Sequence, residues 1–158
     1  MTSEPRDAQS VEFNAALGIA LKSLSGTDKF TAEIRQSLEN KGVDSQTSEE
    51  VIAHLLMRNI LNDLRCAKAV IEASIGKKTV GKRRLYDKLL LRGAPDEIVE
   101  ELLNQASDET DRMTELIASR PSSGATYERS ARLLLSRGFE PDDVEEFLTA
   151  RLPTEPRD

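Results

Sequence analysis

Residues 76–82 contain a pattern that is used to bind phosphate. They read Gly-Lys-Lys-Thr-Val-Gly-Lys, which has the glycine and lysine spacing of the phosphate-binding loop Gly-x-x-x-x-Gly-Lys. In that loop a Ser or Thr follows the lysine and binds magnesium, and a buried strand comes before it. Here Arg83 follows the lysine, and the preceding residues have helical spacing. We therefore interpret the segment as a basic loop between helices, with Gly81 opening the second one.

Other residue types that carry catalysis stand alone in this chain. His54 is the only histidine and Cys66 the only cysteine, so neither has the second imidazole or thiolate that a zinc site requires. We expect Cys66 to be a small core residue rather than a nucleophile. The adjacent glutamates at 100–101 and 145–146 diverge around a helix and do not form a catalytic carboxylate pair. The sequence predicts no enzyme, no cofactor and no metal site.

The elements that position these residues are predicted to be helices. Apolar residues recur at spacings of three and four in nine segments of the 158-residue chain, which indicates nine short helices and no strand. Examples are the sets Phe13, Leu17, Leu21, Leu24 and Leu64, Ala67, Ile71, Ile75. Capping signals agree with this pattern, because Thr47 and Glu50 form a capping box, Asn62 suits an N-cap, and Pro95 and Pro141 suit first turns. The predicted fold class is all-α.

Three segments of the chain are alike. Each has a leucine shortly before a Lys/Arg-Gly pair and an apolar residue after it, and the glycines are Gly42, Gly93 and Gly138. Their spacing leaves room for three helices per unit. We predict three-helix repeats at 10–58, 59–106 and 107–151, stacked into an elongated and curved array, with frayed tails at 1–9 and 152–158. We interpret each Lys/Arg-Gly pair as a helix terminator, in which a left-handed glycine ends the helix and the cation faces its negative end.

Charge is unevenly distributed along the chain. Residues 59–93 hold 9 Lys/Arg against 3 Asp/Glu, a net charge of +6, whereas residues 94–158 hold 7 against 16, a net charge of −9. The whole chain has a net charge of −6, which argues against non-specific coating of nucleic acid as its main task. The asymmetry is typical of a two-sided contact surface, although solvated helix faces of clustered sign also produce it.

These features together resemble the RecX family of small bacterial regulatory proteins, over residues 16–148. The resemblance rests on three features: the repeated Lys/Arg-Gly frame; residues 60–67, which look like the family's apolar-Asp/Asn-Asp-x-x-aromatic-Ala helix start; and Gly-Lys-Arg-Arg-Leu at 81–85, which resembles the glycine and basic turn that open its second repeat. It implies a modular helical protein that lies in the groove of the RecA–DNA filament and restrains recombination and the DNA-damage (SOS) response. Three departures stand out: Cys66 replaces a usual aromatic residue, residues 26–31 lack an arginine-rich start, and the acidic third repeat argues against DNA contact there.

From this we expect a non-enzymatic RecA regulator that acts in DNA repair. Its predicted partner-binding patch is Lys77, Lys78, Lys82, Arg83, Arg84 and Lys88. Arg84 and Lys88 should share one exposed face, with Leu85 and Leu89 turned inward. The expected partner is the RecA filament, with single-stranded DNA inside it as a further contact.

Two alternatives remain open at this stage. One is a helical adaptor that docks a protein through acidic residues 94–158 and never meets nucleic acid, and the other is a stand-alone nucleic-acid binder. No apolar run approaches the ~20 residues of a membrane span and the start lacks a signal-peptide pattern. We therefore expect a cytoplasmic monomer that does not contact a membrane.

Overall fold

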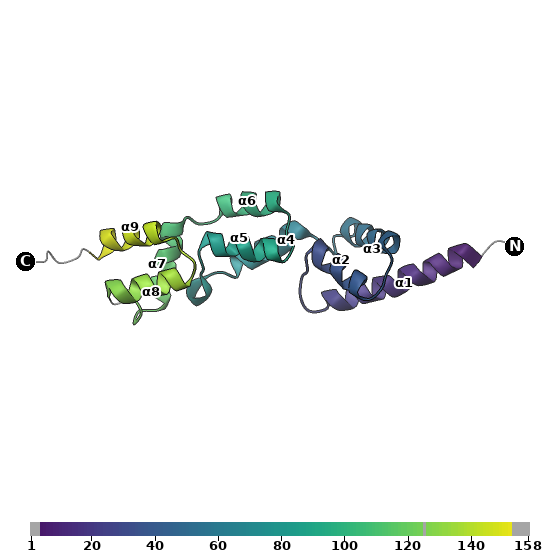
Figure 1. Ribbon diagram of the computed structural model, residues 1–158, viewed down its shortest axis with the longest axis horizontal. Helices are drawn as coiled ribbons and strands as arrows, with labels where there is room; N and C mark the ends of the chain where they lie inside the picture. The colour runs from purple at the N-terminus through teal and green to yellow at the C-terminus, as the bar shows by residue number, and fades with distance from the viewer. Residues whose placement is uncertain (1–3, 125, 153–158) are drawn as a thin grey trace, which may run out of the picture. The chain divides into compact units, whose positions relative to one another are not determined.

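The computed structural model describes residues 4–124 and 126–152 (Figure 1). Within these ranges the prediction of nine helices and no strand is confirmed, and the chain is all-α. The helices are α1 (Glu4–Leu24), α2 (Thr31–Asn40), α3 (Ser45–Met57), α4 (Asp63–Glu72), the short 3-10 helix η1 (Gly76–Lys78), α5 (Lys82–Leu91), α6 (Asp96–Gln105), α7 (Glu109–Ser119), α8 (Tyr127–Ser136) and α9 (Pro141–Arg151). None of the described helices is long and apolar enough to cross a bilayer.

Helix α3 starts earlier than its capping signal predicted. The prediction of a capping box formed by Thr47 and Glu50 is wrong, because the helix begins at Ser45 and its N-cap is Asp44. The Asp44 carboxylate accepts hydrogen bonds from both the backbone N–H and the hydroxyl of Thr47, each at 2.8 Å. The predicted Asn62 cap is confirmed, since its side-chain oxygen accepts the Arg65 N–H at 2.9 Å. Asp is a favoured N-cap residue, and Asp44 takes this position three residues before Thr47. The pattern of Thr47 and Glu50 therefore lies inside the helix and does not mark its start.

Two other boundaries differ from the sequence pattern. Helix α1 begins at Glu4, inside the segment 1–9 predicted to be a tail. Helix α4 ends at Glu72, so Ile75 lies beyond it and is 60% exposed instead of continuing the apolar face. Most of the predicted C-terminal tail, residues 153–158, lies outside the described residues.

The chain divides into two compact units. The N-terminal unit comprises residues 1–67 and 91–95, and the C-terminal unit comprises residues 68–90 and 96–158. In the first unit α1, α2 and α3 pack on one another around Ala16, Ala20, Ile34, Leu38, Val51, Ile52, Leu55 and Leu61. In the second, α8 packs on α7 and α9 around Met113, Leu116, Leu134, Phe139, Val144, Phe147 and Leu148. The repeat borders inside the chain, and the elongated curved shape, stay predictions.

The repeat glycines end their helices as predicted. Gly42, Gly93 and Gly138 have φ angles of +77°, +91° and +83°, in the left-handed region that favours glycine. Gly138 also has a packing role, because a Cβ atom built on Gly81 would lie only 2.5 Å from the Gly138 carbonyl oxygen. The turn after α8 therefore packs directly, backbone on backbone, against the start of α5.

The cations beside two of these glycines do not face their own helix ends, which differs from our interpretation. The Arg92 guanidinium pairs with Glu33 at 2.9 Å and lies 4.9 Å from the centre of the Phe30 ring, both at the start of α2. The Arg137 guanidinium donates to the Lys77 carbonyl oxygen at 2.7 Å. Each arginine thus fastens its turn to another element of the same unit, a contact that the local sequence pattern does not encode.

Candidate functional site

The predicted cationic patch is displayed by η1 and α5 in the C-terminal unit. Leu85 and Leu89 are buried on the inner face of α5, whereas Arg84 and Lys88 are exposed, as their spacing predicted. Lys77 and Lys78 form the exposed turn of η1. The loop therefore presents lysines to solvent rather than forming a phosphate-binding loop after a strand.

Two members of the patch are partly used by the fold. Lys82 is half-buried, and its Nζ donates to the Ala106 carbonyl oxygen at 3.4 Å, while its backbone N–H donates to the Glu109 carboxylate at 3.1 Å. Arg83 forms an ion pair with Asp87 at 3.4 Å, one turn along α5. The charge of Arg83 is therefore partly offset on the protein surface.

The side chain of a third member of the patch, Arg84, extends from α5 to α8. Its guanidinium donates to the Ser136 carbonyl oxygen at 2.6 Å, and a Cβ atom built on Gly138 would lie 2.9 Å from its Nε. The Arg84 side chain thus lies across the C-terminal turn of α8. The patch is consequently continuous with α8, a helix that the charge count had assigned to the acidic third repeat.

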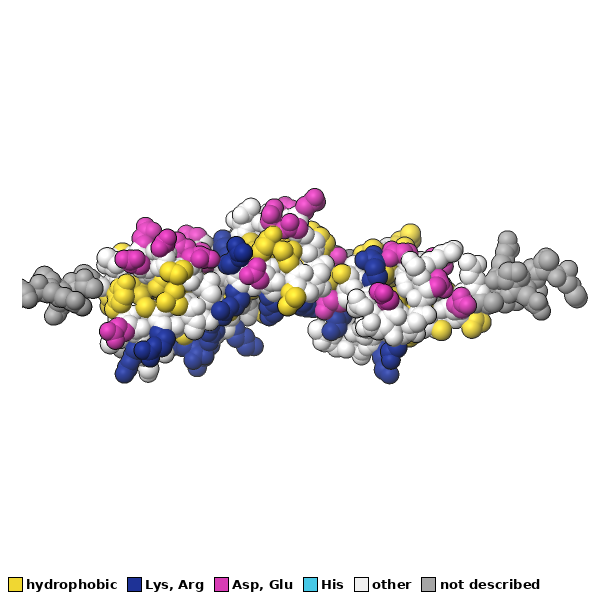
Figure 2. Space-filling view, viewed as in Figure 1, with side chains coloured by type: hydrophobic (Ala, Val, Ile, Leu, Met, Phe, Trp, Pro, Cys, Tyr) yellow, Lys and Arg dark blue, Asp and Glu magenta, His cyan; other side chains and the backbone are white. Residues whose placement is uncertain are grey.

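Helix α8 supplies cations that the sequence analysis missed. Arg129 and Arg132 are exposed and stand three residues apart, on neighbouring positions of the helix surface. Figure 2 shows lysine and arginine side chains along the edge of the C-terminal unit that carries η1 and α8, and carboxylates mainly over α6 and α9. Counting charge over residues 94–158 added the arginines of α8 to the carboxylates of α6 and α9, and gave a single negative net charge. The sequence signal for this cationic face is the three-residue spacing of Arg129 and Arg132, which places both on one side of a helix.

A buried arginine holds the η1 loop in place. Arg112 of α7 is 5% exposed, and its guanidinium donates to Ser74 Oγ at 2.9 Å and to the Val80 carbonyl oxygen at 3.2 Å. Burial lowers the pKa of Arg112, and the nearby Glu109 carboxylate, 3.8 Å away, opposes this shift. The lysines of η1 are therefore carried by a loop whose two ends are fastened to the same side chain.

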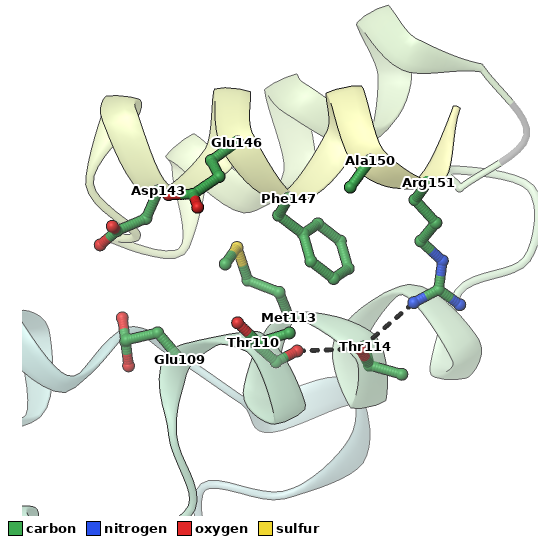
Figure 3. A pocket seen from close by; sticks show the side chains of 9 residues that line it. All are labelled: Glu109, Thr110, Met113, Thr114, Asp143, Glu146, Phe147, Ala150 and Arg151. Carbon is green, nitrogen blue, oxygen red and sulfur yellow. Dashed lines mark hydrogen bonds between the residues drawn. The ribbon is translucent and has the colours of Figure 1, made fainter. Parts of the chain in front are cut away.

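A second surface feature is an acidic groove between α7 and α9, with a volume of about 450 Å³ (Figure 3). Its apolar floor includes Met113 and Phe147, and Arg151 closes one end with its guanidinium 5.3 Å from the centre of the Phe147 ring. Carboxylates of Glu109 and Asp143 lie at the other end. Burial raises the pKa of Glu109, and repulsion from Asp143 adds to that rise.

Of the remaining candidates, Cys66 is a side chain of the core and His54 is partly buried. Cys66 is 2% exposed, and burial raises the pKa of its thiol, so the prediction of a core cysteine is confirmed. His54 packs edge-on against the Phe13 ring, with ring centres 5.5 Å apart. No cluster of three metal-binding side chains is found in the part of the chain that the structure describes.

Comparison with known proteins gives consistent similarities. Residues 16–55 match the family model described as "RecX, first three-helix domain". The regulatory protein RecX of Vibrio vulnificus is 31% identical over 126 residues, covering 76% of this chain and 82% of that protein. RecX of Prosthecochloris aestuarii is 28% identical over 137 residues, covering 84% and 91%. The crystal structure of RecX from Lactobacillus salivarius shares the fold, with a TM-score of 0.73, 19% identity, and coverage of 89% of this chain and 97% of that one.

Proposed function

This chain belongs to the RecX family of regulatory proteins, and on this premise we propose that it binds RecA filaments and restrains their activity in recombination, DNA repair and the DNA-damage response. It acts by binding and catalyses no reaction. The contact is made through the cationic patch of η1 and α5, with single-stranded DNA inside the filament within reach. We propose that the protein works in the cytoplasm, as a monomer.

The observation that carries this proposal is the display of exposed cations by an otherwise acidic chain. Lys77, Lys78 and Lys88 all point to solvent from one unit. Lys77 and Lys78 stand near the well-anchored start of α5, where Arg112 and Glu109 hold the backbone, and Lys88 lies in the last turn of that helix. A rigid cationic surface favours contact with a filament that contains a polyanion, because attraction is gained without ordering a flexible segment.

The test is the effect of the purified chain on DNA-stimulated ATP hydrolysis by RecA. We expect the wild-type chain to lower the rate of hydrolysis. The triple variant Lys77→Ala, Lys78→Ala, Lys88→Ala should require a higher concentration for the same effect and show a weaker dependence on salt. Lys82 and Arg84 are left intact because they make contacts within the fold.

The matched control removes three exposed cations from the N-terminal unit, through Lys22→Ala, Lys41→Ala and Arg58→Ala. It changes the net charge equally and should inhibit like the wild type. Equal inhibition by both folded triple variants would refute the assigned patch. No effect of the wild-type chain on RecA would refute the function.

A second candidate function is supported by the acidic groove between α7 and α9. Its apolar floor of Met113 and Phe147 beside the carboxylates of Glu109 and Asp143 suits a basic segment of a partner protein. In that case the chain is an adaptor that makes no nucleic-acid contact. Fluorescence anisotropy with single-stranded DNA separates the functions: binding that RecA and ATP strengthen favours the RecA regulator, and no binding with or without RecA favours the adaptor.

A further inference from the structure

We propose that a groove on α8 binds the phosphodiester backbone of single-stranded nucleic acid. The groove lies between α8 and the turn that joins α7 to α8, and has a volume of about 550 Å³. Its lining consists of Ser122, Ser123, Arg129, Arg132, Leu133 and Ser136. This site deepens the proposed function, on which it rests for its biological setting, and it lies in the repeat whose acidity argued against DNA contact.

The chemistry of the lining suits phosphate oxygens. Arg129 and Arg132 supply guanidinium groups from adjacent positions of one helix face, and guanidinium forks donate two parallel hydrogen bonds to an oxyanion. Within the described residues, no Asp or Glu forms an ion pair with either arginine. Their charge is therefore available to an external anion. Hydroxyl groups of Ser122 and Ser123 on the opposite wall add uncharged donors of the kind found at phosphate contacts.

The groove continues into the cationic patch, which points to a long anion rather than a single ion. Arg84 of α5 donates to the Ser136 carbonyl oxygen at 2.6 Å, at the end of the groove. The next residue, Arg137, donates to the Lys77 carbonyl oxygen at 2.7 Å. Arginines of α8, Arg84 and the lysines of η1 therefore follow one another across a single unit, as successive phosphates do along a strand.

The lining also indicates which part of a nucleic acid is contacted. Leu133 is its only large apolar side chain, and no aromatic residue lines the groove. Binding of bases by stacking uses aromatic side chains, and a groove without them contacts the backbone without reading the sequence. Figure 2 shows the carboxylates of the unit mainly over α6 and α9. Two acids lie nearer to the proposed path: Glu128 in the first turn of α8, and Glu115, whose carboxylate accepts the Gly76 N–H of η1 at 2.9 Å.

The test measures binding of a fluorescent oligothymidylate to the full chain without RecA, at low ionic strength, where phosphate contacts are strongest. The double variant Arg129→Gln, Arg132→Gln should weaken binding by about tenfold and reduce the salt slope by about 1.4, since each lost single-strand contact removes about 0.7. The control Lys41→Gln, Arg58→Gln makes the same charge change in the N-terminal unit and should bind nearly as well as the wild type. A second variant, Ser123→Asp, adds a repelling charge and should also weaken binding.

Three results would overturn the proposal. One is a folded double variant that binds with unchanged affinity and salt slope. Another is equal competition by polyglutamate and oligothymidylate at matched charge, which would assign the groove to an acidic protein segment. The third is inhibition of RecA by a wild-type chain that binds no oligothymidylate, and in that case the proposed function stands while this site fails. A wild-type chain that binds oligothymidylate but does not inhibit RecA refutes the proposed function and supports the site.

Discussion

The Asp63 carboxylate at the start of α4 accepts a hydrogen bond from the backbone N–H of Thr31 at 2.8 Å, and another from the Thr31 hydroxyl at 3.0 Å. Thr31 is the first residue of α2, whose N–H lacks a partner within the helix. The same arrangement recurs where Glu109, the first residue of α7, accepts the N–H of Lys82, the first residue of α5. An acid that opens one helix thus caps another helix, once in each compact unit.

We expect Asp63→Ala to lower the free energy of unfolding by about 1–2 kcal/mol, because it leaves two donors at the start of α2 unsatisfied. Urea denaturation of the purified variant measures the loss. The control Asp87→Ala removes an exposed acid whose ion pair with Arg83 lies on the surface of α5, and should change stability by less than about 0.5 kcal/mol. Equal midpoints for the two variants would contradict the capping role.

Two glycine substitutions should act in opposite directions. Gly18 lies within α1, and a Cβ atom there would meet nothing within 4 Å, so Gly18→Ala should stabilise the protein by about 0.5–1 kcal/mol. Gly81→Ala would place a Cβ atom 2.5 Å from the Gly138 carbonyl oxygen and should destabilise by about 1–3 kcal/mol. Thermal unfolding followed by circular dichroism compares the pair. A Gly81→Ala variant as stable as wild type would show that the backbone contact between these turns is absent in solution.

Stability of the N-terminal unit should decrease in acid. The hydrogen bond from Arg65 lowers the pKa of Asp28 below 3.8. Burial alone would raise the pKa of Glu33, but hydrogen bonds from Arg92 and from the Phe30 N–H outweigh it and hold that pKa below 4.5. Since the unfolded state binds protons more readily at both sites, their contribution is present above about pH 4.5 and is lost as pH falls through the folded-state values.

The variant Glu33→Gln tests this pH dependence directly. We expect it to be less stable than the wild type at pH 7, with the difference in unfolding free energy shrinking as pH falls below about 4. Urea titrations at a series of pH values measure that difference. The exposed substitution Glu39→Gln serves as the control. A difference that stays constant between pH 7 and pH 3 would show that the Glu33–Arg92 pair does not contribute to stability.

The thiol of Cys66 should react slowly with a disulfide reagent such as DTNB. The residue is 2% exposed, and burial raises the pKa of its thiol, so both access and the thiolate fraction are reduced. At pH 8 we expect labelling of the folded chain to be at least ~100-fold slower than in denaturant, because it requires transient opening. Labelling at the rate of an exposed thiol would remove Cys66 from the core.

Much of this fold is local and therefore readable from the sequence. Apolar spacing of three and four residues predicts nine helices, since only one face of each can be buried, and the glycines at 42, 93 and 138 mark helix ends because their left-handed φ suits no other residue as well. The outward direction of Arg84 and Lys88 follows from the same periodicity. The family resemblance also rests on these local motifs.

What the tertiary structure alone decided is which distant residues meet. The pairing of Arg92 with Glu33, of Arg137 with Lys77 and of Asp63 with Thr31 joins positions more than 30 residues apart. No periodicity within a helix encodes such contacts, because they depend on how separate helices pack. For the same reason a count along the chain assigned α8 to an acidic region, whereas packing placed the C-terminal turn of α8 against Arg84, and Figure 2 shows the carboxylates mainly over α6 and α9. Charge acts through distance in space, and sequence gives only distance along the chain.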